Sequence, residues 1–165
     1  MSSGNFVNAA HSVGINSFHF EWCPKYRFAL LGGRFIHTAI EESILGTCKQ
    51  YGMQLLALEV AADHIHLFVN LPPHISVSKA LQLLKGRSSR AAFQQCPSFR
   101  KVYRKGHFWS PGKFYRSVSN VSGETILRYI KEHKHKELHR SIGGIRAEMK
   151  QLSLLSFCQS GNPAL

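Results

Sequence analysis

Acidic side chains are scarce in this sequence of 165 residues, and aspartate occurs only once, as Asp63. Nine acidic residues stand against 21 lysines and arginines, which gives a formal net charge of +12. A nuclease or polymerase that holds two metal ions between clustered aspartates is therefore not expected. The positive excess instead favours a polyanionic partner, and nucleic acid is the first candidate.

Several patterns that carry function in other proteins are missing. The four cysteines form no Cys-x-x-Cys pair, which argues against a zinc knuckle or a thiol redox motif. Neither a phosphate-binding Gly-x-x-x-x-Gly-Lys-Ser/Thr loop nor a Gly-x-Ser-x-Gly turn is present. The sequence also lacks a signal peptide and any apolar run of about 18 residues, so we expect a cytoplasmic protein with no membrane contact.

Hydrophobic spacing predicts one domain over residues 16–140, with a flexible tail at 1–15 and a C-terminal extension at 141–165. The predicted order is strand, helix, strand, strand, helix, strand, helix. This order is typical of a ferredoxin-like (RRM-like) α+β sandwich, an antiparallel sheet with helices on one face, plus an additional C-terminal helix. Strands are expected at 18–23, 53–60 and 64–71, and two short strands at 107–109 and 114–118 take the last strand position. Helices are expected at 36–51, 77–91 and 122–140.

The strand at 64–71 carries the most informative residues. Side chains alternate along a strand, so His64 and His66 share one face while Ile65, Leu67 and Val69 share the other. Two imidazoles side by side on one rigid strand form half of a metal site, although this spacing also arises by chance. A metal needs further ligands, and a reaction needs a nucleophile.

Tyr129 and His133 in the helix at 122–140 are candidates for these roles. They are four residues apart and so lie on nearly one face of the helix. A neighbouring apolar stripe would dock this helix on the sheet, which would bring both residues to the edge of a site containing His64 and His66. Alternatively, Tyr129 borders the core and His133 belongs to the solvated charge run at 131–136.

Four segments together resemble the single-tyrosine HUH transposases of the TnpA type, the insertion-sequence-200-like family of bacteria and archaea. These segments, in order within residues 16–140, are Trp22–Arg27, Asp63–Val69, Leu84–Arg90 and Ile126–Ile130. The resemblance implies a DNA transposase that nicks and rejoins single-stranded DNA at insertion-sequence ends through a 5′-phosphotyrosine intermediate. It also implies hairpin-forming DNA ends as partners, a homodimer, and the cytoplasm of a prokaryotic cell.

Position by position, the resemblance makes Tyr129 the catalytic nucleophile on the C-terminal helix and His64 and His66 the metal ligands. The family commonly has glutamine four residues after the tyrosine, where this chain has His133 as the implied third ligand. The cofactor is expected to be a divalent metal, Mg²⁺ or Mn²⁺. The histidine at this position leaves the choice between them open, because imidazole suits transition metals better than Mg²⁺.

Basic residues are expected to follow the phosphates of a single strand. Aromatic residues at 108, 109, 114 and 115 could stack on bases, although strand aromatics more often pack in a core. The expected phosphate contacts are Lys25 and Arg27 near the first strand and Lys79, Lys85, Arg87 and Arg90 on the second helix.

Two other functions remain open at this stage. A non-catalytic single-stranded nucleic-acid-binding module on the same fold would explain the charge, with His64 and His66 as accidental neighbours. A two-histidine phosphoesterase would use the His-x-Ser sequences at 74–76 and 139–141, but it requires both on strands.

Overall fold

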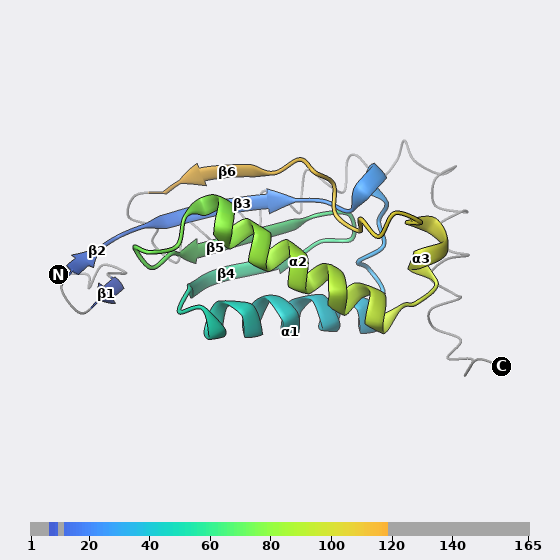
Figure 1. The fold of residues 1–165 in the computed structure, drawn as a ribbon, viewed down its shortest axis with the longest axis horizontal. Helices are drawn as coiled ribbons and strands as arrows, with labels where there is room; N and C mark the ends of the chain where they lie inside the picture. Colours follow the sequence, from blue (N-terminus) through green and yellow to red (C-terminus); the bar gives the residue numbers. More distant parts are fainter. Residues whose placement is uncertain (1–6, 10–11, 119–165) are drawn as a thin grey trace.

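The computed structural model describes residues 7–9 and 12–118, and its centre is a four-stranded sheet (Figure 1). The strands follow the spatial order β4-β5-β3-β6, and every neighbouring pair is antiparallel. Their bounds are β3 (Ser17–Trp22), β4 (Gln54–Val60), β5 (Ile65–Asn70) and β6 (Phe114–Ser117).

Two long helices, α1 (Arg34–Gln50) and α2 (Val77–Gln95), lie together on one face of this sheet (Figure 1). Helix α1 begins directly after Gly32 and Gly33, and the Ser76 side chain caps α2 by accepting a hydrogen bond from the Lys79 amide at 3.2 Å. Strand order and helix placement confirm the predicted ferredoxin-like α+β class. The predicted helix at 122–140, with Tyr129 and His133, lies outside the described residues.

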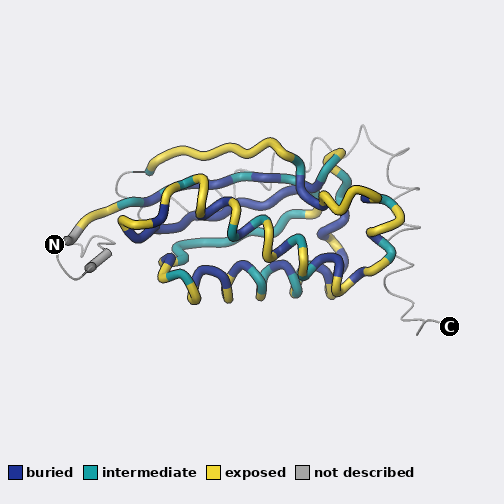
Figure 2. Tube along the Cα trace, viewed as in Figure 1, coloured by how far each residue is buried: buried dark blue, intermediate teal, exposed yellow. Residues whose placement is uncertain are grey.

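The hydrophobic core fills the space between the helices and the sheet (Figure 2). Helix α1 contributes isoleucines at four-residue spacing, and alternate positions of β3 and β5 point toward them. The main contributors are Phe20, Trp22, Ile36, Ile40, Ile44, Ile65, Leu67, Val69, Leu81 and Leu84, all buried. The alternation therefore leaves the other face of β3 and β5 for different side chains.

The prediction of a strand at 107–109 is wrong, because only Trp109 forms an isolated bridge, with Pro24. Aromatic packing takes precedence here. The Phe108 ring lies 5.5 Å from the rings of Phe99 and Tyr103, and the Trp109 indole donates to the Ser88 hydroxyl at 3.1 Å. Phe108 and Trp109 are therefore core residues, whereas Phe114 and Tyr115 on β6 are exposed.

The remaining described elements are short. A 3-10 turn, η1 (Lys25–Arg27), follows β3, and helix α3 (Phe99–Val102), which the sequence analysis did not predict, follows α2. Strands β1 (Val7–Ala9) and β2 (Ser12–Gly14) pair with each other within residues 1–15, the segment predicted as a tail. Within residues 7–9 and 12–118, no helix is long and apolar enough to span a lipid bilayer.

Candidate active site

His64 and His66 meet on the sheet face turned away from α1 and α2. His64 immediately precedes β5, His66 lies within it, and both side chains are buried. Their Nε2 atoms are 2.9 Å apart. Two nitrogens bound at right angles to one ion, each about 2.1 Å from it, would be about 3 Å apart. The donor set and its convergence therefore fit two adjacent ligands of a single divalent ion, as the strand alternation predicted.

Asp63 anchors the outer edge of the His64 ring. Its Oδ1 lies 2.6 Å from His64 Nδ1, and its Oδ2 accepts a hydrogen bond from Arg27 Nε at 2.8 Å. Burial alone would raise the pKa of Asp63, but the hydrogen bonds from His64 and Arg27 outweigh it and hold the pKa at about 2. Asp63 is thus ionised at neutral pH. It fixes the proton of His64 on Nδ1 and turns the Nε2 lone pair toward His66.

Arg27, which the sequence analysis assigned to DNA, is held in this ion pair at the sheet edge. Its backbone has a φ of 51°, and the preceding Tyr26 has a φ of 67°, both in the left-handed region. Such conformations cost about 1–3 kcal/mol each for a residue other than glycine. The ion pair to Asp63 and the stacking of Tyr26 on Tyr103, with ring centroids 6.3 Å apart, hold the turn in this shape.

His19 is a member of the site that the sequence analysis missed. It lies on β3, is fully buried, and places Nε2 3.0 Å from Nδ1 of His66. Its ring stacks on Phe68 at 4.4 Å with an interplanar angle of 12°. The alternation of β3 already placed His19 opposite its apolar face, but only the pairing of β3 with β5 brings it to His66.

Two carboxylates share this face with His66. Glu21 on β3 and Glu59 on β4 are its direct partners across the two neighbouring strands. Among the described residues, however, no group of three or more His, Cys, Asp or Glu side chains is arranged to hold a metal. The histidine pair is therefore half of a site, and the predicted third ligand, His133, lies outside the described part of the chain, as does Tyr129.

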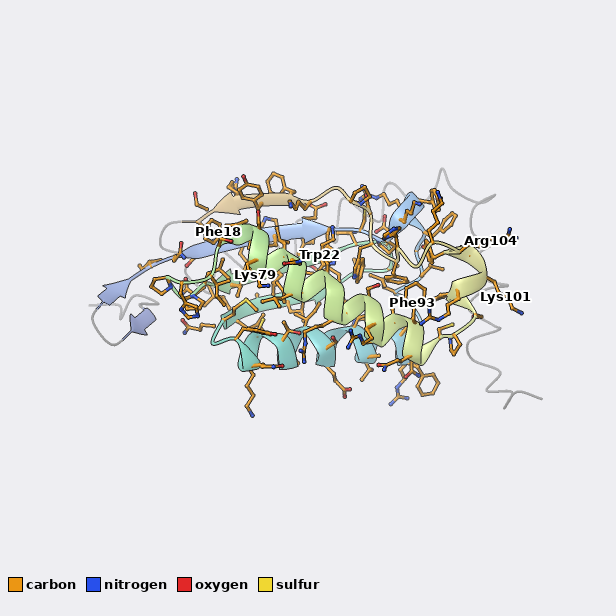
Figure 3. All side chains as sticks on the ribbon, viewed as in Figure 1. Phe18, Trp22, Lys79, Phe93, Lys101 and Arg104 are labelled. Atoms are coloured by element: carbon orange, nitrogen blue, oxygen red, sulfur yellow. The ribbon has the colours of Figure 1, made fainter. Side chains whose placement is uncertain are left out.

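Three of the predicted phosphate-binding residues lie away from the histidines. Lys79, Arg87 and Arg90 are exposed on α2, in the helix layer on the opposite side of the sheet from the histidines. Figure 3 shows Lys79 near the start of α2 and places Lys101, within α3, and Arg104, just after it, at the far end. Basic side chains therefore lie at both ends of the α2–α3 segment.

Lys85 and Lys25 have contacts within the protein. Lys85 donates hydrogen bonds from Nζ to the carbonyl oxygens of Ser110 at 2.7 Å and Gly112 at 3.1 Å. Burial, together with the nearby charge of Lys113, lowers the pKa of Lys85. Lys25 Nζ lies 4.9 Å from the centre of the Tyr26 ring. Lys85 thus ties α2 to the loop before β6.

His74 of the first His-x-Ser sequence is exposed in the loop between β5 and α2. It is not on a strand, as a two-histidine phosphoesterase would require. The second sequence, at 139–141, lies outside the described residues. The phosphoesterase hypothesis thus fails at the half that the structure describes.

The fold and the buried histidine pair agree with one protein family. A family model described as "Transposase IS200 like" matches residues 13–133, which is most of the chain. The chain belongs to the IS200-like transposase family. The predicted family and the predicted enzyme class, a DNA transposase, are therefore confirmed.

Individual relatives give the same result. The ISDra2 transposase TnpA of Deinococcus radiodurans is 28% identical over 120 residues, covering 73% of this chain and 85% of that protein. The transposase for insertion sequence element IS200 of Salmonella typhimurium is 30% identical over 128 residues, covering 78% and 83%. A crystal structure of a Deinococcus radiodurans protein described as a candidate transposase matches with a TM-score of 0.62 at 26% identity, covering 76% and 96%.

Proposed function

We propose that this transposase nicks and rejoins single-stranded DNA at insertion-sequence ends in a metal-dependent reaction that passes through a 5′-phosphotyrosine. The observation that carries the proposal is the convergence of His64 and His66, whose Nε2 atoms are 2.9 Å apart on a buried strand. A buried imidazole pair of this kind has no packing advantage over the apolar residues beside it. Its position in a chain of the IS200-like transposase family supports a chemical role for the pair.

Tyr129 is the proposed nucleophile. Its Oη attacks the scissile phosphorus and forms an O–P bond, while the bond from phosphorus to the 3′ oxygen breaks. The phenol loses its proton and the 3′ oxygen gains one, which leaves a free 3′-OH and a 5′-phosphotyrosine. The ester keeps the energy of the phosphodiester, so a 3′-OH of another strand can reverse the step without ATP.

His64 and His66 would hold Mg²⁺ or Mn²⁺, with His133 as a third protein ligand. A bound divalent ion supplies charge that polarises the phosphate and offsets the negative charge on the leaving oxygen. The chain's own part is to present nitrogen lone pairs in a fixed direction. Asp63 does this for His64 through a 2.6 Å contact, and Arg27 steadies Asp63 in turn.

The DNA partner is proposed to be a hairpin-forming end of the element. The exposed Lys79, Arg87 and Arg90 on α2 supply charge for its phosphates. This surface is separated from the histidines by the sheet, so one DNA molecule would have to reach both sides, or two molecules or two subunits would share them. A homodimer is the arrangement we propose, and light scattering of the purified chain measures its mass directly.

The test is a covalent adduct between the protein and labelled single-stranded DNA carrying the element's ends, scored on a denaturing gel with Mn²⁺ or with EDTA. The wild-type chain should form an adduct only with the ion. Tyr129→Phe should form none, yet should bind the DNA as tightly as the wild type. Tyr26→Phe is the matched control, because it removes another phenol that lies outside the proposed chemistry.

If Tyr129→Phe forms as much adduct as the wild type, Tyr129 is not the nucleophile. DNA binding with no adduct from the wild-type chain under any ion would instead favour the non-catalytic binding module.

A further inference from the structure

Four side chains of the site stand in a row, each touching the next through a polar atom. Asp63 Oδ1 is 2.6 Å from His64 Nδ1, the two Nε2 atoms of His64 and His66 are 2.9 Å apart, and His66 Nδ1 is 3.0 Å from His19 Nε2. These three contacts use both ring nitrogens of His64 and of His66. The row therefore constrains where each imidazole proton can sit.

Counting protons along these three contacts gives the tautomers for three neutral rings with no ion bound. A neutral histidine has one ring proton, and each hydrogen bond needs one. His64 donates a hydrogen bond from Nδ1–H to the Asp63 carboxylate, so its Nε2 can only accept one. His66 must then donate from Nε2–H, which leaves its Nδ1 to accept a hydrogen bond from His19 Nε2–H. His64 is protonated on Nδ1, and His66 and His19 are protonated on Nε2.

Binding of an ion between His64 and His66 demands a different arrangement. Both Nε2 lone pairs must then face the ion, so the proton of His66 must be on Nδ1. From there His66 donates a hydrogen bond to His19 Nε2. His19 Nε2 can accept this bond only when His19 carries its own proton on Nδ1. Each imidazole keeps one proton, so the change needs no net uptake or release.

We propose that His19 is a positioning residue that changes tautomer together with His66 when a divalent ion binds, and that its acceptor nitrogen holds His66 in the ion-binding form. The inference rests on the proposed function, because it assumes that His64 and His66 are ion ligands. In this arrangement the ring nitrogen of His66 that does not face the ion is hydrogen-bonded to a neutral imidazole, that of His19. The corresponding nitrogen of His64 is hydrogen-bonded to a carboxylate, that of Asp63.

Packing favours an exchange of protons rather than a rotation of rings. The His19 ring is fully buried and stacks on Phe68 at 4.4 Å and on His66 at 5.2 Å. Turning the ring over would disturb both contacts. The change we expect is therefore visible as a change in which nitrogen carries hydrogen, with the rings in place.

Nitrogen-15 NMR of the histidine rings tests this in the full-length chain. Spectra are recorded at about pH 8, above the usual histidine pKa of about 6.5, with and without Zn²⁺, a diamagnetic ion that imidazole binds well. Single histidine variants assign the signals, and the His64→Ala/His66→Ala chain identifies Zn²⁺ bound elsewhere. We expect His64 to keep its proton on Nδ1, and His66 and His19 both to change from Nε2–H to Nδ1–H.

The possible outcomes separate the two claims. If the signals of His64 and His66 respond to Zn²⁺ while His19 keeps its tautomer, the inference is wrong and the metal site stands. If neither His64 nor His66 responds at saturating Zn²⁺, the metal site of the proposed function is wrong, and the inference fails with it.

Two substitutions measure what the acceptor contributes. His19→Phe keeps a flat ring against Phe68 but has no acceptor, whereas His19→Gln offers a carbonyl oxygen to His66 Nδ1. By calorimetry, His19→Phe should bind Zn²⁺ at the histidine pair about 10–100-fold more weakly than the wild type, which is the usual effect of losing an outer partner. His19→Gln should recover part of the loss. Equal affinity in the wild type and His19→Phe would contradict the proposal, and the wild-type spectra decide it if either variant fails to fold.

Discussion

The two faces of the sheet are built from the same strands, but one packs against the helices and the other carries the histidines. On β5, Leu67 points to the helices and is packed in the core, whereas its neighbour His66 points the other way and is equally buried, at 2% exposure. Its partners are imidazole nitrogens instead of methyl groups. One face is held by burial of apolar surface, and the other by a series of short polar contacts.

The sheet thus separates the apolar core from the polar site, with one on each face. Among residues 12–118, the helix-covered face contains most of the large buried apolar side chains, and the opposite face has a small cluster around Phe68. A change on the first face should therefore affect folding, and a change on the second should affect ion binding and chemistry.

His66→Ala should reduce adduct formation the most. Loss of an outer partner already costs about 10–100-fold in ion affinity, so loss of a ligand should exceed about 100-fold. Metal affinity by calorimetry and adduct yield on a gel measure it. Cleavage that survives in His66→Ala at ordinary ion concentrations would show that the chemistry does not depend on the histidine face of the sheet.

Leu67→Ala should give the opposite pattern. Its side chain is fully buried between sheet and helices, so truncation should lower the free energy of unfolding by about 2–5 kcal/mol. Urea denaturation measures the loss. The fraction that remains folded should bind ions as the wild type does, and a large drop in its affinity would mean that the two faces are not independent.

Asp63→Asn should have an intermediate effect. The amide cannot supply the charge that holds His64 Nδ1–H, so ion affinity should fall about 10–100-fold. Arg27→Gln leaves the carboxylate beside His64 and should cost less. An Arg27→Gln effect larger than that of Asp63→Asn would indicate that Arg27 acts directly, for example on DNA.

Salt dependence of DNA binding should show the smallest change. Each phosphate neutralised on a single strand contributes about −0.7 to the slope of log K against log salt, so Arg87→Gln and Arg90→Gln should each make it shallower by about that amount. Lys85→Gln is the internal comparison. Its Nζ already contacts two carbonyl oxygens, so the slope should change less. If both arginine variants keep the wild-type slope of log K against log salt, α2 is not part of the DNA interface.

Much of the fold could be predicted because its signals are local. Alternation along β3 and β5, four-residue spacing in α1 and the Gly32-Gly33 turn each depend on neighbours in the chain. Residues 107–109 could not be placed in this way. Phe108 packs against Phe93 of α2 and Phe99 of α3, and these contacts form no strand or helix pattern.

The candidate site shows the same limit. The His64 and His66 pair was predictable, since both residues belong to one strand. His19 was not, because its contact with His66 depends on how β3 pairs with β5, a register that no local pattern specifies. Lys85 likewise looked like a surface charge in the helical pattern, and only the tertiary fold brings the carbonyls of the loop before β6 to its end.

The most direct test of the account is whether His64 and His66 hold the ion that cleavage needs. Mn²⁺ binding is measured by electron paramagnetic resonance in the wild-type chain and in the His64→Ala/His66→Ala chain, and the same samples are scored for the DNA adduct. We expect His64 and His66 to hold this ion, which gives one tight Mn²⁺ site and an adduct in the wild type and the loss of both in the variant. Mn²⁺ bound equally tightly by both chains, or an adduct formed by the variant, would contradict it.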